Sequence, residues 1–258
     1  MNSEPAPETQ FLCRAGAPDL AYDLLPGAGP VVVFLGGFTS DRTGTKATAL
    51  RAYCAGHGWS CLRLDYSGHG ASGGAFVAGS IGQWTDDALA VIDAATSGPL
   101  LLAGSSMGGW IMTLVALARP ERVAGMVGVA VAPDFTEELL WSSLSAAQRC
   151  VLRDAGCLTL PGSGEGPPVM IGWELIEDGR RRRVLDQPMP FRGPVRLLHG
   201  LADREVPWQT SVRLAQVIDG PDTAVTLLKD GDHRLSSPAH LEQVLRAVNE
   251  VRDRVLAG

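Results

Sequence analysis

The chain has 258 residues, of which 45% are hydrophobic and 19% are charged, and its formal net charge is −6 at pH 7. This length suits one large domain or two small ones, and it is enough to bury a sizeable core without disulfides or metals. The low charged fraction excludes an intrinsically disordered chain, and the acidic balance is the opposite of that of nucleic-acid-binding domains. No window approaches the roughly 18 consecutive apolar residues of a membrane span. We therefore expect a soluble protein with no nucleic-acid partner.

Strand-like and helix-like segments alternate along most of the chain. Residues 11–14 and 20–25 predict a short antiparallel opening, and later apolar runs predict strands that are buried on both faces. Those strands cover residues 31–35, 61–64, 100–103, 123–131, 195–198 and 225–228, and the predicted helices cover residues 45–57, 81–96, 110–118 and 241–251. This alternation is typical of a mostly parallel central sheet with helices on both faces, so we expect the α/β class.

One long segment, residues 134–192, interrupts this alternation. It contains two polar helical patterns around a Gly- and Pro-rich loop at residues 161–168. The segment is too long to be a simple connection in a compact domain. We therefore expect a core formed by residues 1–133 and 193–258, and an inserted helical cap subdomain formed by residues 134–192.

A G-x-S-x-G pentapeptide, GSSMG at residues 104–108, lies between a predicted strand and a predicted helix. Such a turn presents the serine hydroxyl above the sheet, and side chains at the two glycine positions would collide in so sharp a turn. This register selects Ser106 as a candidate nucleophile and excludes Ser105. A second match, GASGG at residues 70–74, has no helical pattern after it, so we interpret Ser72 as a loop serine.

A serine nucleophile needs a base, and the base needs an acid that orients it. Asp203 and His233 each follow one of the last two predicted strands and therefore reach the carboxyl edge of the sheet, where Ser106 is expected. The predicted catalytic triad is Ser106, His233 and Asp203. Asp134, after an earlier predicted strand, is the alternative acid. Three other aspartates, Asp65, Asp230 and Asp232, are interpreted as turn formers.

The four remaining histidines have structural interpretations. His57 ends a predicted helix, His69 lies in a glycine turn, and His240 opens the last helix. His199, at the end of a strand, is expected to hold the Asp203 loop through a hydrogen bond.

A tetrahedral intermediate needs two aimed N–H donors. We expect one from the backbone of Met107, directly after the nucleophile, and the other from the backbone of Phe38 in the Gly-Gly-Phe loop after the strand at residues 31–35. The alternative is that these glycines only permit a tight turn.

No metal or cofactor is expected. The five cysteines form no CxxC pair and no His–Cys metal spacing, and we interpret them as buried, reduced thiols. The glycine-rich segments match neither the dinucleotide-binding nor the phosphate-loop pattern.

These motifs resemble those of the serine α/β-hydrolases, and in more detail those of the palmitoyl-protein thioesterase family that also hydrolyses mycophenolic acid acyl-glucuronide. The matching stretches are LGGF at 35–38, DYSGHG at 65–70, GSSMGGW at 104–110, APDFT at 132–136, LIEDGR at 175–180 and GDHRLS at 231–236. The resemblance implies an α/β-hydrolase fold with a cap, cleavage of esters or thioesters, and Ser106, Asp203 and His233 as the triad. Animal members are mitochondrial, whereas residues 1–10 show no presequence pattern, so we expect a bacterial-type, cytoplasmic enzyme.

Two groups of cap residues have open interpretations. The arginines at 180–183 would suit an anionic leaving group such as a glucuronide or a CoA phosphate, but the adjacent Glu177 and Asp178 favour a solvated, charged turn. Trp141 and Trp173 suit either an acyl pocket or the core of the cap.

The predicted function is hydrolysis of carboxylic ester or thioester bonds through an acyl-enzyme intermediate, as in acyl-protein thioesterases, carboxylesterases and acyl-glucuronide esterases. The expected partner is a small-molecule or lipid-like acyl substrate, with an S-acylated protein as an alternative. Two other functions use the same fold. One is carbon–carbon bond hydrolysis on the same triad, and the other is ligand binding without catalysis.

Overall fold

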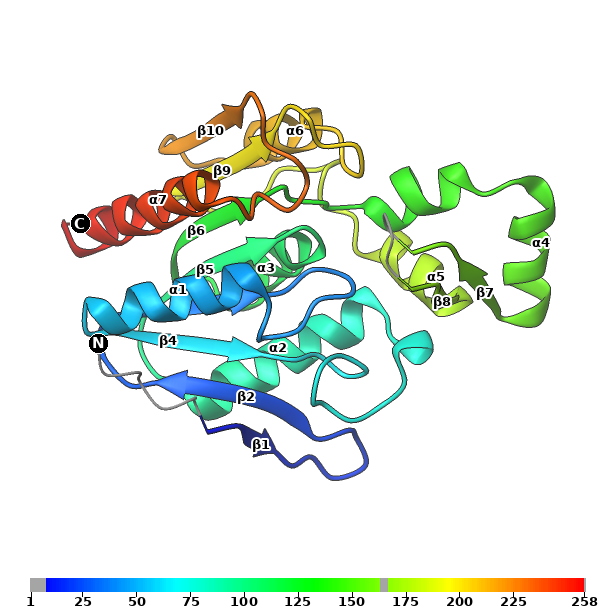
Figure 1. Cartoon of the computed structure of the whole chain (residues 1–258), viewed down its shortest axis with the longest axis horizontal. Helices are drawn as coiled ribbons and strands as arrows, with labels where there is room; N and C mark the ends of the chain where they lie inside the picture. The colour runs from blue at the N-terminus through cyan, green and yellow to red at the C-terminus, as the bar shows by residue number, and fades with distance from the viewer. Residues whose placement is uncertain (1–7, 163–166, 258) are drawn as a thin grey trace.

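An eight-stranded sheet forms the centre of the computed structural model, which describes residues 8–162 and 167–257. Its strand order is β1-β2-β4-β3-β5-β6-β9-β10; β1 and β2 are antiparallel to their neighbours, and the other strands are parallel. The strands are β1 (Gln10–Leu12), β2 (Leu20–Leu25), β3 (Ala28–Leu35), β4 (Trp59–Leu64), β5 (Leu100–Ser105), β6 (Val123–Val129), β9 (Val195–Gly200) and β10 (Thr223–Leu228). The predicted α/β class is confirmed (Figure 1).

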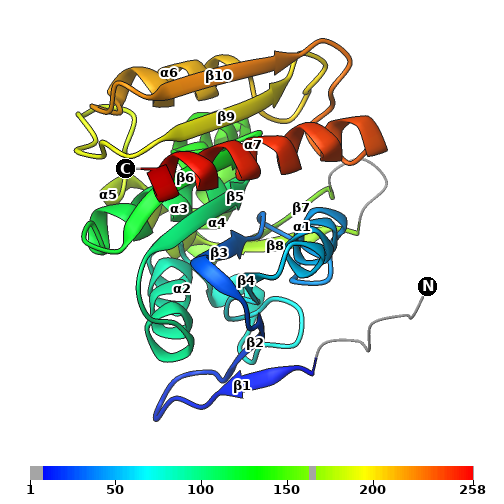
Figure 2. The same ribbon diagram turned by 90° about the vertical axis from the view of Figure 1, so that its left-hand side faces the viewer.

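Helices cover both faces of the sheet (Figure 2). On one face lie α1 (Thr45–Gly56) and α7 (Pro238–Ala257), and on the other lie α2 (Ile81–Ala95), α3 (Met107–Ala118) and α6 (Gln209–Val217). The apolar run in β3 explains how one strand serves two cores, because side chains alternate between the faces of a sheet. Val31, Val33 and Leu35 join the core under α2 and α3, while Val32 and Phe34 join the core under α1 and α7.

The segment after β6 forms a separate lobe beyond the carboxyl edge of the sheet (Figure 1). It contains the π-helical segment η2 (Thr136–Trp141), α4 (Ala146–Ala155), an antiparallel pair of strands, β7 (Cys157–Leu160) and β8 (Val169–Gly172), and α5 (Trp173–Arg181). The two predicted helices of the cap are present as α4 and α5, but the Gly- and Pro-rich loop also joins a pair of strands, β7 and β8, that was not predicted. Residues 163–166 of the loop lie outside the described residues.

Asp134 joins the two ends of this lobe. Its buried carboxylate accepts hydrogen bonds from the N–H groups of Val184 (2.9 Å) and Leu185 (3.1 Å), which lie 50 and 51 residues later. Burial raises the pKa of Asp134, and those two hydrogen bonds oppose the rise. The carboxylate therefore joins the two ends of the inserted segment.

All five cysteines are free thiols, but only Cys54 and Cys61 are buried. Cys13 and Cys150 are exposed, so the expectation that the cysteines are core thiols was wrong for these two. Gly156, in the left-handed region with φ 74°, ends α4 before Cys157, so no continuous helix joins Cys150 to Cys157. Across the described parts of the chain, no helix has both the length and the apolar character to cross a membrane.

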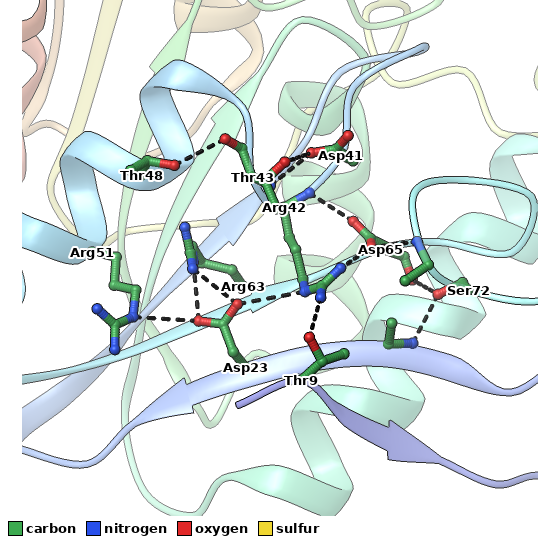
Figure 3. Close-up of polar contacts among 12 residues, drawn as sticks. Thr9, Asp23, Asp41, Arg42, Thr43, Thr48, Arg51, Arg63, Asp65 and Ser72 are labelled. Atoms are coloured by element: carbon green, nitrogen blue, oxygen red, sulfur yellow. Dashed lines mark hydrogen bonds and ion pairs between the residues drawn. The ribbon is translucent and has the colours of Figure 1, made fainter. Parts of the chain in front are cut away.

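A buried ion network joins β2, β4 and the loop after β3 (Figure 3). Arg63 donates to both carboxylate oxygens of Asp23 (3.1 and 3.0 Å). Arg42 donates to Asp65 through its backbone N–H (2.6 Å) and through its guanidinium (2.5 Å). Asp65 also accepts from the Ala71 N–H (2.9 Å) in the turn after β4, so it is a turn former, as interpreted, and in addition an anchor for the loop after β3.

Replacing Asp65 by asparagine tests this anchor. We expect Asp65→Asn to lower the free energy of unfolding by about 3 kcal/mol, because it leaves the buried guanidinium of Arg42 without a full counter-charge. Asp93→Asn is the matched control, since Asp93 pairs with Arg119 and Arg122 at the surface and such pairs contribute about 1 kcal/mol or less. Urea denaturation measures both values, and equal small losses would contradict the anchoring role.

Candidate active site

Ser106 lies at the sharp turn between β5 and α3 with φ 54° and ψ −120°. A side chain at either glycine of the pentapeptide would collide with backbone: a Cβ atom at Gly104 would lie 2.4 Å from the Gly108 carbonyl oxygen, and one at Gly108 would lie 2.1 Å from the Leu35 carbonyl oxygen. The helix begins at Met107, three residues earlier than predicted. Ser106 is thus held in a strained conformation at the N-terminal end of α3.

The three residues of the predicted triad form one hydrogen-bonded chain, with His233 in the middle. The Ser106 hydroxyl lies 3.0 Å from Nε2 of His233, and Nδ1 of His233 lies 2.8 Å from Oδ2 of Asp203. Asp203 comes from the β9–α6 loop and His233 from the β10–α7 loop. The Asp203 side chain is fully buried, and that of His233 is 15% exposed. The imidazole of His233 therefore lies between the Ser106 hydroxyl and the buried Asp203 carboxylate.

Asp203 accepts four hydrogen bonds. Besides His233, His199 donates to its Oδ2 through Nε2 (3.0 Å), and the N–H groups of Glu205 (2.8 Å) and Val206 (2.9 Å) donate to Oδ1. Burial raises the pKa of Asp203, but the hydrogen bonds from His199 and His233 outweigh it and hold the pKa well below its ordinary range. This charge stabilises the fold at neutral pH, and its contribution is lost as the pH falls below about 4 toward the folded-state pKa.

The second ring nitrogen of His199 lies 2.7 Å from the Ser211 hydroxyl. Because Nε2 of His199 faces two acceptors, the Asp203 carboxylate and the Val206 carbonyl at 3.1 Å, it carries the proton and Nδ1 accepts from Ser211. His199 thus holds the Asp203 loop in place, which agrees with the sequence interpretation.

The alternative candidates have other partners. Asp134 bonds to the backbone of the cap, as described above. Ser72 accepts a hydrogen bond from the Ala21 N–H (2.8 Å) and donates to the Asp65 carbonyl (2.6 Å), so it is a loop serine. His57 contacts the Tyr53 carbonyl, and His240 lies 3.3 Å from Asp230.

The two predicted oxyanion donors, the N–H groups of Phe38 and Met107, belong to residues that line the same cavity as Ser106. Neither N–H has an acceptor among the residues that the structure describes. Both are therefore available to a bound oxygen atom, while their catalytic role stays a prediction.

His69 contacts the carbonyl group of Phe38, whose N–H is the predicted donor: Nε2 of His69 lies 2.8 Å from that carbonyl oxygen. The Phe38 ring meets those of Phe76, Trp84 and Phe135 edge-on, at centroid distances of 5.0, 5.9 and 5.4 Å. Burial lowers the pKa of His69, and its hydrogen bonds to the carbonyls of Phe38 and Ser67 oppose this. The sequence analysis placed His69 in a glycine turn and did not predict this contact; the available signal was that this turn follows β4, the strand that flanks β3.

A cavity of about 540 Å³ opens onto Ser106, and two sets of its lining residues differ in chemistry; they are named the apolar wall and the polar wall. One wall is apolar and includes cap residues: Phe38, Met107, Phe135, Leu139, Leu140 and Val206. The other is polar and comes from the loop after β3, the start of α1 and the loop after His233: Thr39, Ser40, Asp41, Thr45, Lys46 and Arg234.

The cap residues with open interpretations lie outside this lining. The rings of Trp141 and Trp173 lie 5.4 Å apart, and the guanidinium of Arg180 lies over both. They form a core for the cap rather than a wall of the cavity. Each arginine of the 180–183 run has a carboxylate partner, which supports the charged turn: Arg180 with Glu137, Arg181 with Glu174, Arg182 with Asp178 and Arg183 with Asp186.

Within the described ranges, 8–162 and 167–257, no group of three or more His, Cys, Asp or Glu side chains has a geometry that would hold a metal ion.

Replacing Asp203 by asparagine tests its role as the acid. We expect Asp203→Asn to lower kcat by about 10⁴-fold, because the amide no longer fixes the required tautomer of His233. Steady-state kinetics on a chromogenic ester measures the loss. Asp230→Asn is the matched control on an exposed carboxylate beside another histidine, and it should stay within twofold of the unmodified enzyme. A comparable loss in Asp134→Asn, with Asp203→Asn active, would reassign the acid.

Comparisons with known proteins agree with this geometry. The family model described as serine aminopeptidase, S33, matches residues 28–156. The human mitochondrial palmitoyl-protein thioesterase ABHD10 is 35% identical over 246 residues, covering 95% of this chain and 80% of that protein. Two solved structures are each 36% identical to this chain, and each match covers 96% of this chain and 99% of the other. They are α/β-hydrolase domain-containing protein 10 from mouse, with a TM-score of 0.88, and a putative hydrolase from Agrobacterium vitis S4, with a TM-score of 0.91. The chain therefore has the α/β-hydrolase fold and belongs to the ester- and thioester-hydrolysing family that includes the palmitoyl-protein thioesterase ABHD10.

Proposed function

We propose that the chain is a serine hydrolase that cleaves thioester and oxygen-ester bonds of acyl substrates through an acyl-enzyme on Ser106. The observation that carries the proposal is the position of His233, 3.0 Å from the Ser106 hydroxyl and 2.8 Å from Asp203. All three lie at the carboxyl edge of a parallel sheet, where enzymes of this architecture bind their ligands, and Ser106 and His233 line one cavity there.

In the first half of the reaction, the Ser106 oxygen attacks the acyl carbonyl carbon while Nε2 of His233 takes the hydroxyl proton. Asp203 is ionised and accepts from Nδ1 of His233, so it stabilises the imidazolium that forms. The negative charge that develops on the carbonyl oxygen is received by the N–H groups of Phe38 and Met107. Collapse of this intermediate breaks the bond to the thiol or alcohol, which leaves with the proton from His233.

In the second half, a water molecule attacks the acyl group on Ser106 and gives its proton to His233. The second tetrahedral intermediate then releases the carboxylic acid, and the proton returns to the Ser106 oxygen. The same donors act in both halves. The mechanism therefore requires no group beyond those of the chain and water.

The apolar wall indicates the acyl part of the substrate. Phe135, Leu139 and Leu140 come from the start of the cap, and Phe38 comes from the loop after β3. Burying a hydrocarbon chain against such side chains contributes about 0.8 kcal/mol per methylene. A cavity of about 540 Å³ has room for a medium-length acyl chain beside the reacting carbonyl.

A pair of octanoyl substrates, one thioester and one oxygen ester with otherwise equal leaving groups, tests the proposal. We expect both to be hydrolysed, because a serine with two N–H donors stabilises the same intermediate from either. Ser106→Ala should lower kcat/KM by about 10⁴-fold or more for both. Ser105→Ala, one residue earlier in the same pentapeptide, should keep most of the activity and is the matched control.

The outcome also separates the alternatives. Turnover of neither substrate by the folded protein would favour carbon–carbon bond hydrolysis or ligand binding without catalysis. Turnover that survives in Ser106→Ala would remove Ser106 as the nucleophile. The ratio of kcat/KM for the two substrates in the unmodified enzyme measures its preference between thioesters and oxygen esters.

A further inference from the structure

The polar wall of the cavity contains two cations, Lys46 and Arg234. Lys46 lies in the first turn of α1, and its ammonium group donates to the carbonyl of Arg234 at 2.5 Å. Arg234 directly follows His233. The chain has only two lysines, Lys46 and Lys229, and only Lys46 lines this cavity.

These two cations are not neutralised by direct ion pairs. Among the residues that the structure describes, neither the Lys46 ammonium nor the Arg234 guanidinium has a carboxylate within ion-pair distance. Burial lowers the pKa of Lys46 to about 8, with the charge of Asp232 opposing the shift and that of Arg234 adding to it. The lysine is therefore still mostly protonated at pH 7.

The carboxylates nearby are engaged elsewhere. Asp41 lines the cavity, but its Oδ1 accepts from the N–H (2.7 Å) and the hydroxyl (2.6 Å) of Thr43. Glu205 lines the cavity beside Val206 and is exposed to solvent. Asp232 accepts from the Leu235 N–H at 2.9 Å. None of the three contacts Lys46 or Arg234 directly.

The start of α1 adds to the positive potential of this wall. Gly44 at its N-cap provides no side-chain cap, and its first turn contains no acidic residue. The N-terminal end of a helix carries a partial positive charge, which favours an anion nearby. The helix end supports the two side-chain cations and would not make a site without them.

The position of the cations relative to the reacting atoms assigns them to one side of the substrate. The leaving thiol or alcohol must take its proton from Nε2 of His233, so it departs toward the His233 loop. Arg234 is the next residue in that loop, and Lys46 is bonded to its carbonyl. The cap side chains of the apolar wall lie with the acyl group instead.

We propose that Lys46 and Arg234 form a subsite that binds a carboxylate on the leaving group, so that the enzyme prefers esters and thioesters whose thiol or alcohol part is anionic. This rests on the proposed function and names its substrate class. The anion takes two N–H donors of Lys46 that remain free beside its bond to Arg234, together with the guanidinium of Arg234.

The test compares two thioesters that differ in one charge: S-octanoyl-3-mercaptopropionate and S-octanoyl-3-mercaptopropionamide. We expect kcat/KM at pH 7 to be about tenfold higher for the carboxylate, the size expected of one charge-assisted hydrogen bond. Lys46→Gln should reduce this ratio to near one, and Arg234→Gln should reduce it severalfold. Lys229→Gln, which removes the other lysine charge at an exposed position outside the cavity, should leave the ratio unchanged.

The ratio also has a pH signature. Because Lys46 loses its proton near pH 8, the carboxylate-to-amide ratio should fall between pH 7 and 9 in the unmodified enzyme and in Lys229→Gln, but not in Lys46→Gln. An effect of pH on the catalytic steps that both thioesters share cancels in the ratio. Arg234, Asp41, Glu205 and Asp232 are the other charged groups near Lys46, and both thioesters meet the same groups in the cavity.

The outcomes keep this subsite distinct from the proposed function. A ratio near one that no variant changes, or equal losses for both thioesters in Lys46→Gln, would overturn the subsite and leave the hydrolase intact. Equal losses would mean that Lys46 only holds the His233 loop. Calorimetry with the Ser106→Ala protein measures binding to the subsite without turnover. If the unmodified enzyme hydrolyses neither thioester, but the Ser106→Ala protein binds the carboxylate about tenfold more tightly than the amide, the proposed function fails and the subsite stands.

Discussion

The carboxylate of Asp203 is the group on which the arrangement around Ser106 depends. A buried carboxylate is costly unless its oxygens are hydrogen-bonded, and here four donors meet that demand. Two of them are backbone N–H groups of its own loop, and the third is His199, which Ser211 fixes in turn. The fourth is His233. The need to satisfy one charge therefore folds the β9–α6 loop, draws in the loop after β10, and orients the imidazole toward Ser106.

The loop after β3, which contains the proposed oxyanion donor Phe38, is held in a comparable way, from three directions. His69 contacts the Phe38 carbonyl, Asp65 binds Arg42 at the far end of the loop, and the backbone at Gly108 leaves no room for a side chain beside Leu35. Donors that are fixed before the substrate arrives need no reorganisation as charge develops. The Asp65 network thus has a stability role and also keeps the Phe38 N–H in place.

The strands along the chain and the places of Ser106, Asp203 and His233 after them could be predicted because they depend on local signals: apolar runs, a glycine-flanked serine and polar residues soon after strands. The β7–β8 pair could not, because four residues such as Cys157–Leu160 become a strand only when a partner lies beside them. The anchoring role of Asp65 was not predicted for a similar reason. Its partner Arg42 lies 23 residues earlier, and no local pattern indicates that both are buried together.

The distribution of charge in the cap and in the cavity separates structural from ligand-binding cations. The arginines at 180–183 all have carboxylate partners within the cap, so their charge is already balanced and has little left for a ligand. Lys46 is hydrogen-bonded to the carbonyl of Arg234, neither has such a partner among the described residues, and both line the cavity with the proposed base His233. Two unbalanced cations in a partly desolvated wall raise the energy of the empty cavity and lower that of an anionic complex. Lys46 also donates to the carbonyl of Arg234, the residue after His233. An anion bound by Lys46 would therefore be held at a fixed position relative to the proposed base, His233.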